Sequence, residues 1–120
     1  MIKINPNISI FIQLANYIRM DIYSFKRMPG SKLESIRDMA SLLEVNPNTI
    51  KRVYQDLESE GLIYTDGNLG TFVVDDRDLI ITKRNLFIYE RFKEFKGLLK
   101  QCGITEEELN NLVKKEVEDE

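Results

Sequence analysis

The sequence contains no histidine and only one cysteine, Cys102, among its 120 residues. The absence of histidine excludes every histidine-dependent catalytic triad, proton shuttle and metal site. One cysteine cannot form an intramolecular disulfide or a thiolate metal cluster, and its neighbours Leu98 and Leu99 predict a buried thiol. No glycine-rich phosphate loop of the GxxxxGK(S/T) type occurs. We therefore expect a protein that is not an enzyme and that needs no metal or cofactor.

Long apolar runs are also missing from the chain. No stretch approaches the length of a membrane span, and the N-terminus lacks the layout of a signal peptide, so we expect a cytoplasmic protein. Hydrophobic residues make up 42% of the chain and charged residues 31%. These proportions are ordinary for a soluble globular protein, and the length predicts one small domain with an appendage.

An excess of basic residues, the usual signature of a nucleic-acid binder, is absent as well. The net charge is −3 and the isoelectric point is about 5.1. Residues 1–74 carry eight basic and eight acidic side chains, whereas residues 75–120 carry nine and twelve. Any DNA-binding surface must therefore be a local patch on a near-neutral N-terminal part.

Residues 46–61 form the most clearly bounded helix of the sequence. Asn46 is a favoured N-cap, Pro47 suits the first helical position, and Gly61 follows the last turn. Apolar side chains recur at the spacing of one buried helix face, at Ile50, Val53, Tyr54 and Leu57. The other face carries groups that reach base edges and phosphates when a helix enters the major groove, at Asn48, Thr49, Lys51, Arg52 and Gln55. Taken alone, the pattern also fits a solvated amphipathic helix.

Two further helices are predicted before this one. The first runs from Ser9 to about Lys26 and is followed by a turn at residues 28–31. The second runs from Ser35 to about Leu43 and begins with an arrangement that resembles a capping box. Only residues 44–46 then lie between it and the first helical position at Pro47, and Asn46 among them is the cap of the next helix. Two short amphipathic helices joined by so tight a turn predict a helix-turn-helix motif.

The residues after Gly61 predict a β-hairpin. Two short strand-like runs, 62–65 and 71–74, flank a turn at residues 66–70 that contains glycine and asparagine. A helix-turn-helix followed directly by a hairpin is a winged helix, whose wing lies along the DNA backbone. The predicted fold class is mostly α with a small β-hairpin wing, and we expect residues 1–74 to be the DNA-binding domain.

The composition changes at residues 75–78, after which a long helix to Gln101 and a shorter helix from Thr105 are predicted. Apolar residues follow the long helix in alternating steps of four and three, as in a coiled coil, at Ile88, Phe92, Phe95, Leu99 and Cys102. One small domain does not need so much apolar surface. We expect residues 75–120 to be a helical dimerisation segment that uses Ile88, Phe92, Phe95 and Leu99. The alternative is a helical hairpin folded onto its own N-terminal part.

Residues 10–74 resemble the winged-helix domain of the GntR family of bacterial transcription regulators. The resemblance rests on six motifs in order, FIQL (11–14), PGSKL (29–33), SIRDMA (35–40), NPNT (46–49), LESEGLI (57–63) and GTFV (70–73). The short C-terminal part resembles the YtrA subgroup, whose members carry a small helical dimerisation segment instead of a large effector-binding domain.

The resemblance implies a homodimer that binds an inverted-repeat DNA operator and represses transcription, often of ABC-type transporter genes beside its own gene. It also implies that Arg37 holds DNA, as the arginine of the family's Ser-x-Arg motif. The residues expected to contact DNA are Ser35, Arg37, Asn46, Asn48, Thr49, Lys51, Arg52, Gln55, Gly67 and Asn68. Asn48 is the candidate for reading bases, because asparagine can bond adenine through two hydrogen bonds. Asn46 is expected to act mainly as the helix cap.

Two positions depart from the family pattern. Glu34 stands where the family has proline, and an acid near Arg37 would weaken a phosphate contact. Asp66 stands before the wing glycine, Gly67, where the family has arginine or lysine, which argues against a wing contact. The alternative function is therefore a winged helix that binds a protein and no specific DNA sequence. No constellation of residues indicates a small-molecule effector.

Overall fold

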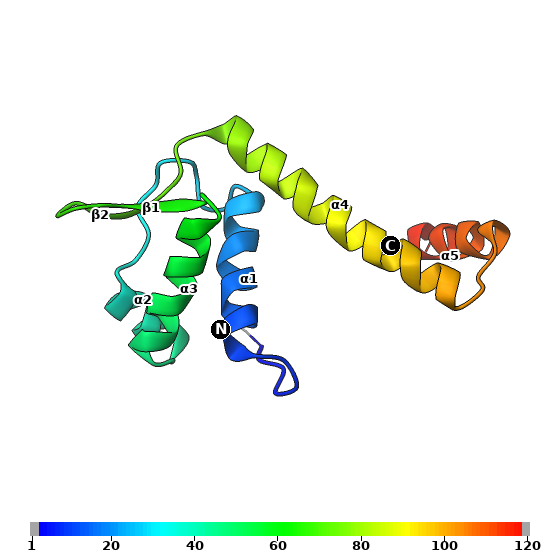
Figure 1. The fold of residues 1–120 in the computed structure, drawn as a ribbon, viewed down its shortest axis with the longest axis horizontal. Helices are drawn as coiled ribbons and strands as arrows, with labels where there is room; N and C mark the ends of the chain where they lie inside the picture. The colour runs from blue at the N-terminus through cyan, green and yellow to red at the C-terminus, as the bar shows by residue number, and fades with distance from the viewer. Residues whose placement is uncertain (1–2, 119–120) are drawn as a thin grey trace. The chain divides into compact units, whose positions relative to one another are not determined.

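Within residues 3–118, which the computed structural model describes, the chain forms five helices and one two-stranded sheet (Figure 1). In chain order the elements are α1 (Ile10–Tyr23), α2 (Ile36–Leu43), α3 (Pro47–Ser59), β1 (Ile63–Asp66), β2 (Gly70–Val73), α4 (Arg77–Gln101) and α5 (Glu106–Glu118). They divide into two compact units, Met1–Lys83 and Arg84–Glu120, which we call the head and the tail. This fold is the predicted one, mostly α with a β-hairpin.

The boundary between head and tail falls inside α4 and past residue 74, where the sequence changes in composition. Ile80, in the first turns of α4, is fully buried, so the start of this helix belongs to the core of the head. The functional division into residues 1–74 for DNA binding and 75–120 for dimerisation stays a prediction, and its residues 1, 2, 119 and 120 lie outside the described part.

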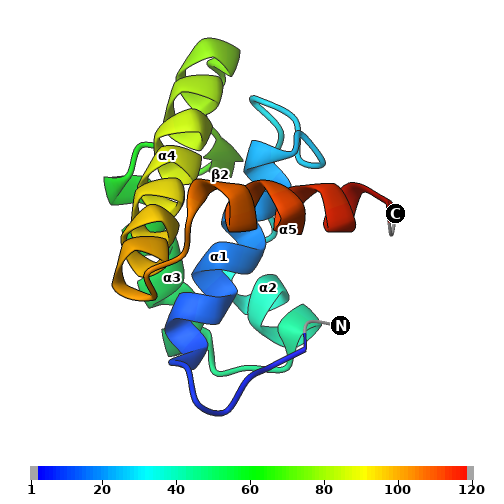
Figure 2. The same cartoon turned by 90° about the vertical axis from the view of Figure 1, so that its right-hand side faces the viewer.

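The head packs α1, α2 and α3 side by side around one apolar core (Figures 1 and 2). The largest fully buried side chains of this core are Leu14, Ile18, Ile22, Met39, Ile50, Val53, Leu57, Leu62, Val73 and Ile80. In α1 and α3 they repeat at the three- and four-residue spacing that the sequence shows, and the buried Met39, Ala40 and Leu43 follow the same pattern in α2. These short helices are therefore stabilised mainly by burial of one apolar face and not by helix propensity alone.

α1 ends at Tyr23 and does not reach the predicted limit at Lys26. Phe25 adopts a left-handed backbone conformation, with φ of 61°, which no α-helix continues through. Its ring lies under the guanidinium of Arg77 in α4, 4.2 Å from ring centroid to guanidinium carbon. A contact between residues far apart in the sequence accompanies this ending, and helical periodicity cannot reveal it.

The wing is the antiparallel pair of β1 and β2, with Ile63 opposite Val73 and Asp66 opposite Gly70. The hairpin prediction is confirmed, and a short third segment joins it. The carbonyl of Thr71 accepts a 2.8 Å hydrogen bond from the N–H of Leu33, and the N–H of Val73 donates a 2.9 Å bond to Ser31. The chain before α2 is thus bound along β2.

The tail consists of the rest of α4 and of α5, and none of its described side chains is buried. Large apolar side chains remain about half exposed along both helices, at Leu86, Ile88, Tyr89, Phe92, Phe95, Leu98, Leu112, Val113 and Val117. The prediction of a buried Cys102 is wrong for the single chain, because no element of the tail covers it. No helix within residues 3–118 is long and apolar enough to cross a membrane.

Candidate nucleic-acid interface

The start of α3 has the structure that its sequence predicts. The side-chain oxygen of Asn46 accepts a 2.8 Å hydrogen bond from the N–H of Asn48, and Pro47 occupies the first turn. After the helix, Gly61 takes a φ of 80°, which glycine adopts without strain. The role of Asn46 as the cap is therefore confirmed. Its bond also fixes the first turn of α3, from which Asn48 and Thr49 project.

The two faces of α3 separate cleanly. Ile50, Val53, Tyr54 and Leu57 are buried, whereas the side that opens with Asn48 is exposed, as the sequence predicts. The members of this polar face are the exposed Asn48, Lys51, Arg52 and Gln55, with the half-buried Thr49 at its margin. The structure brings five of the predicted DNA contacts together on one helix.

The two cations of the polar face have different surroundings. The guanidinium of Arg52 lies over the ring of Phe11 in α1, 4.0 Å from the centroid, so a cation–π contact holds it toward α1. Lys51 forms no ion pair with any residue in the range 3–118. Lys51 is therefore the cation of α3 that remains available to an anionic ligand without breaking an internal contact.

α2 presents a second cation at its start. The hydroxyl oxygen of Ser35 accepts a 3.0 Å hydrogen bond from the N–H of Asp38 and caps the helix. Arg37 follows in the first turn, is exposed, and pairs with no acid in the described residues. An unpaired arginine beside a helix N-terminus suits a phosphate group, since both the guanidinium and the helix dipole attract anions.

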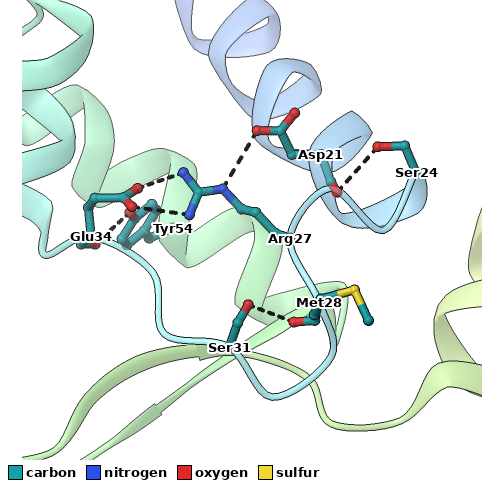
Figure 3. A network of polar contacts seen from close by, with 7 residues as sticks. All are labelled: Asp21, Ser24, Arg27, Met28, Ser31, Glu34 and Tyr54. Atoms are coloured by element: carbon teal, nitrogen blue, oxygen red, sulfur yellow. Dashed lines mark hydrogen bonds and ion pairs between the residues drawn. The ribbon is translucent and has the colours of Figure 1, made fainter.

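Glu34, which was expected to oppose Arg37, is engaged elsewhere (Figure 3). Its two carboxylate oxygens accept hydrogen bonds of 3.2 and 2.6 Å from the guanidinium of Arg27. The hydroxyl of Tyr54 donates a 2.8 Å bond to the backbone carbonyl of Glu34. Burial lowers the pKa of Arg27, but the hydrogen bond and charge of Glu34 outweigh it, so the pKa lies above its ordinary value. The acidic charge of Glu34 is thus matched inside the head.

A second internal arginine, Arg19, joins α1 to the end of α3. Its guanidinium bonds both carboxylate oxygens of Glu60, at 3.0 and 2.5 Å, and also bonds Asn16. Asp56 lies 3.8 Å away, and only 10% of the Arg19 side chain is exposed. Sequence analysis did not single out Arg19 or Arg27. A charged residue at an apolar position of a helix pattern, as Arg19 is beside Ile18 and Ile22, is the signal that indicates such a pair.

These internal pairs change the charge that the head presents to a ligand. Arg19 and Arg27 are matched with four of the eight acids of residues 1–74, at Asp21, Glu34, Asp56 and Glu60. Six basic and four acidic side chains remain outside these pairs. Among the charges outside these pairs, basic side chains therefore outnumber acidic ones, while the paired acids Glu34, Asp56 and Glu60 remain 33–44% exposed.

The wing also gains a cation that sequence analysis did not find. Gly67 and Asn68 lie exposed at the hairpin turn, as predicted. Lys32 pairs with Phe72 of β2, and its side chain runs past Gly70, where a Cβ would lie 2.7 Å from the Lys32 Cε. Lys32, which is distant in sequence, thus gives the wing a basic side chain. Asp66 occupies the position before Gly67 where the family has arginine or lysine. The alternation of exposed Lys32 and buried Leu33 is the sequence signal, but it is too short to identify a strand.

The predicted dimerisation residues lie in the tail and not with the residues described above. Ile88, Phe92 and Phe95 are exposed and Leu99 is half-buried, all within about 60° of one another around α4 at 3.6 residues per turn. The tail therefore offers an apolar surface.

Within residues 3–118 no group of histidine, cysteine or acidic side chains is arranged to hold a metal.

Comparison with known proteins places this geometry in a family. Residues 12–73 match the family described as bacterial regulatory proteins of the gntR family. The transcriptional regulator YhcF of Bacillus subtilis is 33% identical over 100 residues, which cover 83% of each chain. The transcriptional repressor YtrA of the same organism is 29% identical over 117 residues, covering 95% of this chain and 90% of the relative.

Solved structures agree with these relatives. A GntR family transcriptional regulator from Listeria monocytogenes is similar with a TM-score of 0.84 and 33% identity, covering 93% of this chain and 98% of that one. The DNA-binding domain of AraR, solved in complex with its operator ORR3, is similar with a TM-score of 0.53 and 25% identity, covering 62% of this chain and 92% of that one. The chain therefore belongs to the GntR family of bacterial regulatory proteins, as a YtrA-type transcriptional regulator with a winged-helix DNA-binding head.

Proposed function

We propose that the protein is a transcriptional repressor that binds an inverted-repeat operator as a homodimer. The carrying observation is the exposed polar face of α3, with Lys51 unpaired among the described residues, beside an equally unpaired Arg37 at the start of α2. The similarity to YtrA, which is named a repressor, supports repression over activation. The resemblance to the YtrA subgroup extends the proposal to transporter genes beside the protein's own gene.

In this proposal α3 lies in the major groove with its N-terminal turns toward the bases. Asn48 reads a base edge, and Thr49, Lys51 and Gln55 follow along the groove. Ser35 and Arg37 hold one stretch of the phosphate backbone, and Lys32, Gly67 and Asn68 meet the backbone at the wing. Contacts to phosphate position the head, whereas contacts to base edges give the sequence preference. Asn46 caps α3, and Arg52 braces it against Phe11.

The homodimer is proposed from the tail. Ile88, Phe92, Phe95 and Leu99 form one apolar face, of which the first three side chains are exposed and Leu99 is half-buried. Contiguous exposed apolar surface of this kind marks an interaction site in a protein of ordinary composition. A symmetric dimer presents two identical heads, which matches the two half-sites of an inverted repeat.

The test is a salt titration of binding to the DNA upstream of the protein's own gene, with a scrambled duplex of the same composition as the control. We expect the native sequence to be preferred and binding to fall steeply with salt, because phosphate contacts release counterions. A footprint with two protected half-sites would support the dimer on an inverted repeat. Weak binding to both duplexes with a shallow salt slope would contradict the proposal and favour a winged helix that binds a protein partner.

A further inference from the structure

We propose that Arg27 is a positioning residue for DNA binding, which acts by holding the carboxylate of Glu34 away from Arg37. The inference rests on the proposed DNA contact of Arg37 and adds a device that protects it. Glu34 comes immediately before the cap of α2, and Arg37 lies in the first turn of that helix. The two residues are three positions apart in the chain and both side chains are long, so we take a freed Glu34 carboxylate to be able to reach the Arg37 guanidinium.

The present geometry keeps these two side chains apart. Both oxygens of the Glu34 carboxylate are taken by Arg27, at 3.2 and 2.6 Å, and the Arg27 Nε lies 3.6 Å from Asp21 (Figure 3). The side chain of Arg27 is 20% exposed, whereas that of Glu34 is 35% exposed. A bidentate pair of this kind is stronger and more directional than a single contact. The acid is therefore directed inward, although it begins at the edge of the DNA-facing helix pair.

The backbone of Glu34 is held by other groups. The Tyr54 hydroxyl donates to the Glu34 carbonyl, and Ser35 caps α2 through its own side chain. Loss of the Arg27 guanidinium would therefore release the Glu34 carboxylate while the chain at residue 34 keeps its place. The released carboxylate could then pair with Arg37, which has no other acidic partner in the described residues. Arg37 would lose its phosphate, and a negative charge would face the DNA.

The test compares Arg27→Met, Glu34→Gln and the double variant in DNA binding. Methionine keeps most of the apolar stem of Arg27 and removes the charge. We expect Arg27→Met to bind the upstream duplex about fivefold more weakly, equal to about 1 kcal/mol, the upper end for one solvent-exposed ion pair. Glu34→Gln alone should change affinity by less than about twofold, and the double variant should recover to that level.

The salt slope provides a readout that a purely structural role would not change. A phosphate contact contributes about 0.9 to the slope of log affinity against log salt concentration, so Arg27→Met should lower it by about that amount. The double variant should restore the slope. As a further control, Arg27→Met should weaken binding less in an Arg37→Gln background and should leave the salt slope there unchanged, because the freed acid would have no arginine to capture.

Each outcome of the test separates the possibilities. If the double variant binds as weakly as Arg27→Met, the pair is only structural and the inference is overturned. If the wild-type protein does not bind the duplex at all, the proposed function fails instead. Should Arg27→Met fail to fold in a thermal melt, Arg27→Lys serves in its place, since lysine keeps the charge but loses the bidentate geometry. Its weaker loss of affinity must still be restored by Glu34→Gln.

Discussion

Replacement of Phe92 by glutamate is expected to convert the proposed dimer into monomers. Phe92 is 59% exposed in the single chain, near the middle of the apolar face of α4. A phenylalanine side chain offers about 150–250 Å² of surface, so the exposed part of Phe92 is about 100 Å². Its burial stabilises an interface by about 2.5 kcal/mol at 25 cal/mol per Å².

A two-fold symmetric dimer contains this contact twice, so the change removes about 5 kcal/mol of association free energy. Two glutamates placed in an apolar interface add a desolvation cost to that loss. A dimer with a dissociation constant of about 1 μM has about 8 kcal/mol of binding free energy, so the variant should be monomeric at about 50 μM. Sedimentation equilibrium measures the mass directly.

Leu86→Glu is the matched control for this experiment. Leu86 is 57% exposed and lies on the same helix, but it is about 150° around α4 from the face that contains Phe92. The same charge placed there should leave the dimer intact. The reasoning is refuted if Phe92→Glu remains dimeric, or if Leu86→Glu dissociates the chains equally. Circular dichroism of both variants should show the same helix content, since neither change touches the core of the head.

Four further predictions concern the head. Asn48→Ala should cost about 1–3 kcal/mol on the operator and little on scrambled DNA in a binding titration, and equal losses would show that Asn48 does not read bases. Arg37→Ala should weaken binding to all duplexes alike and flatten the salt slope by about one phosphate contact; unchanged affinity at moderate salt would remove it from the interface. Lys32→Ala should flatten the slope similarly if the wing meets the backbone, whereas an unchanged slope would place the wing off the DNA. Burial, with the charge of Glu34, raises the pKa of Tyr54 above its ordinary range, so the folded state keeps this proton at pH values where the unfolded chain loses it. Its contribution to the unfolding free energy should therefore be complete below about pH 10 and should decline as the pH rises above that value. Urea unfolding of Tyr54→Phe should show a shallower alkaline decline, and an identical decline would contradict the assignment.

The helices of the head and their caps could be read from the sequence because they depend on local patterns. The spacing of Ile50, Val53 and Leu57 predicts the buried face of α3, and Asn46 predicts its start. The hairpin followed from glycine and asparagine between two short apolar runs. Each of these features involves residues that are close together in the chain, so the local sequence is enough to predict it.

The contacts that set the charge of the interface could not be read in this way. Arg27 bonds Glu34, Arg19 bonds Glu60, and Lys32 lies along the strand that begins at Gly70. From the sequence alone, Glu34 was expected to oppose Arg37 and the wing to lack a basic residue. In the structure, Glu34 pairs with Arg27 and Lys32 lies beside the wing, because long charged side chains reach residues of other elements. Which partner it meets depends on how those elements pack.

The sequence by itself determined the elements, the family and the exposed polar face of α3, because periodicity, capping and motif order are local properties. The tertiary structure alone decided which charges cancel inside the head and which remain for DNA. It also decided where α1 ends, through the left-handed Phe25 beneath Arg77. The physical reason is the same in each case, since the free energy of a long-range ion pair or ring contact depends on distances that the sequence does not contain.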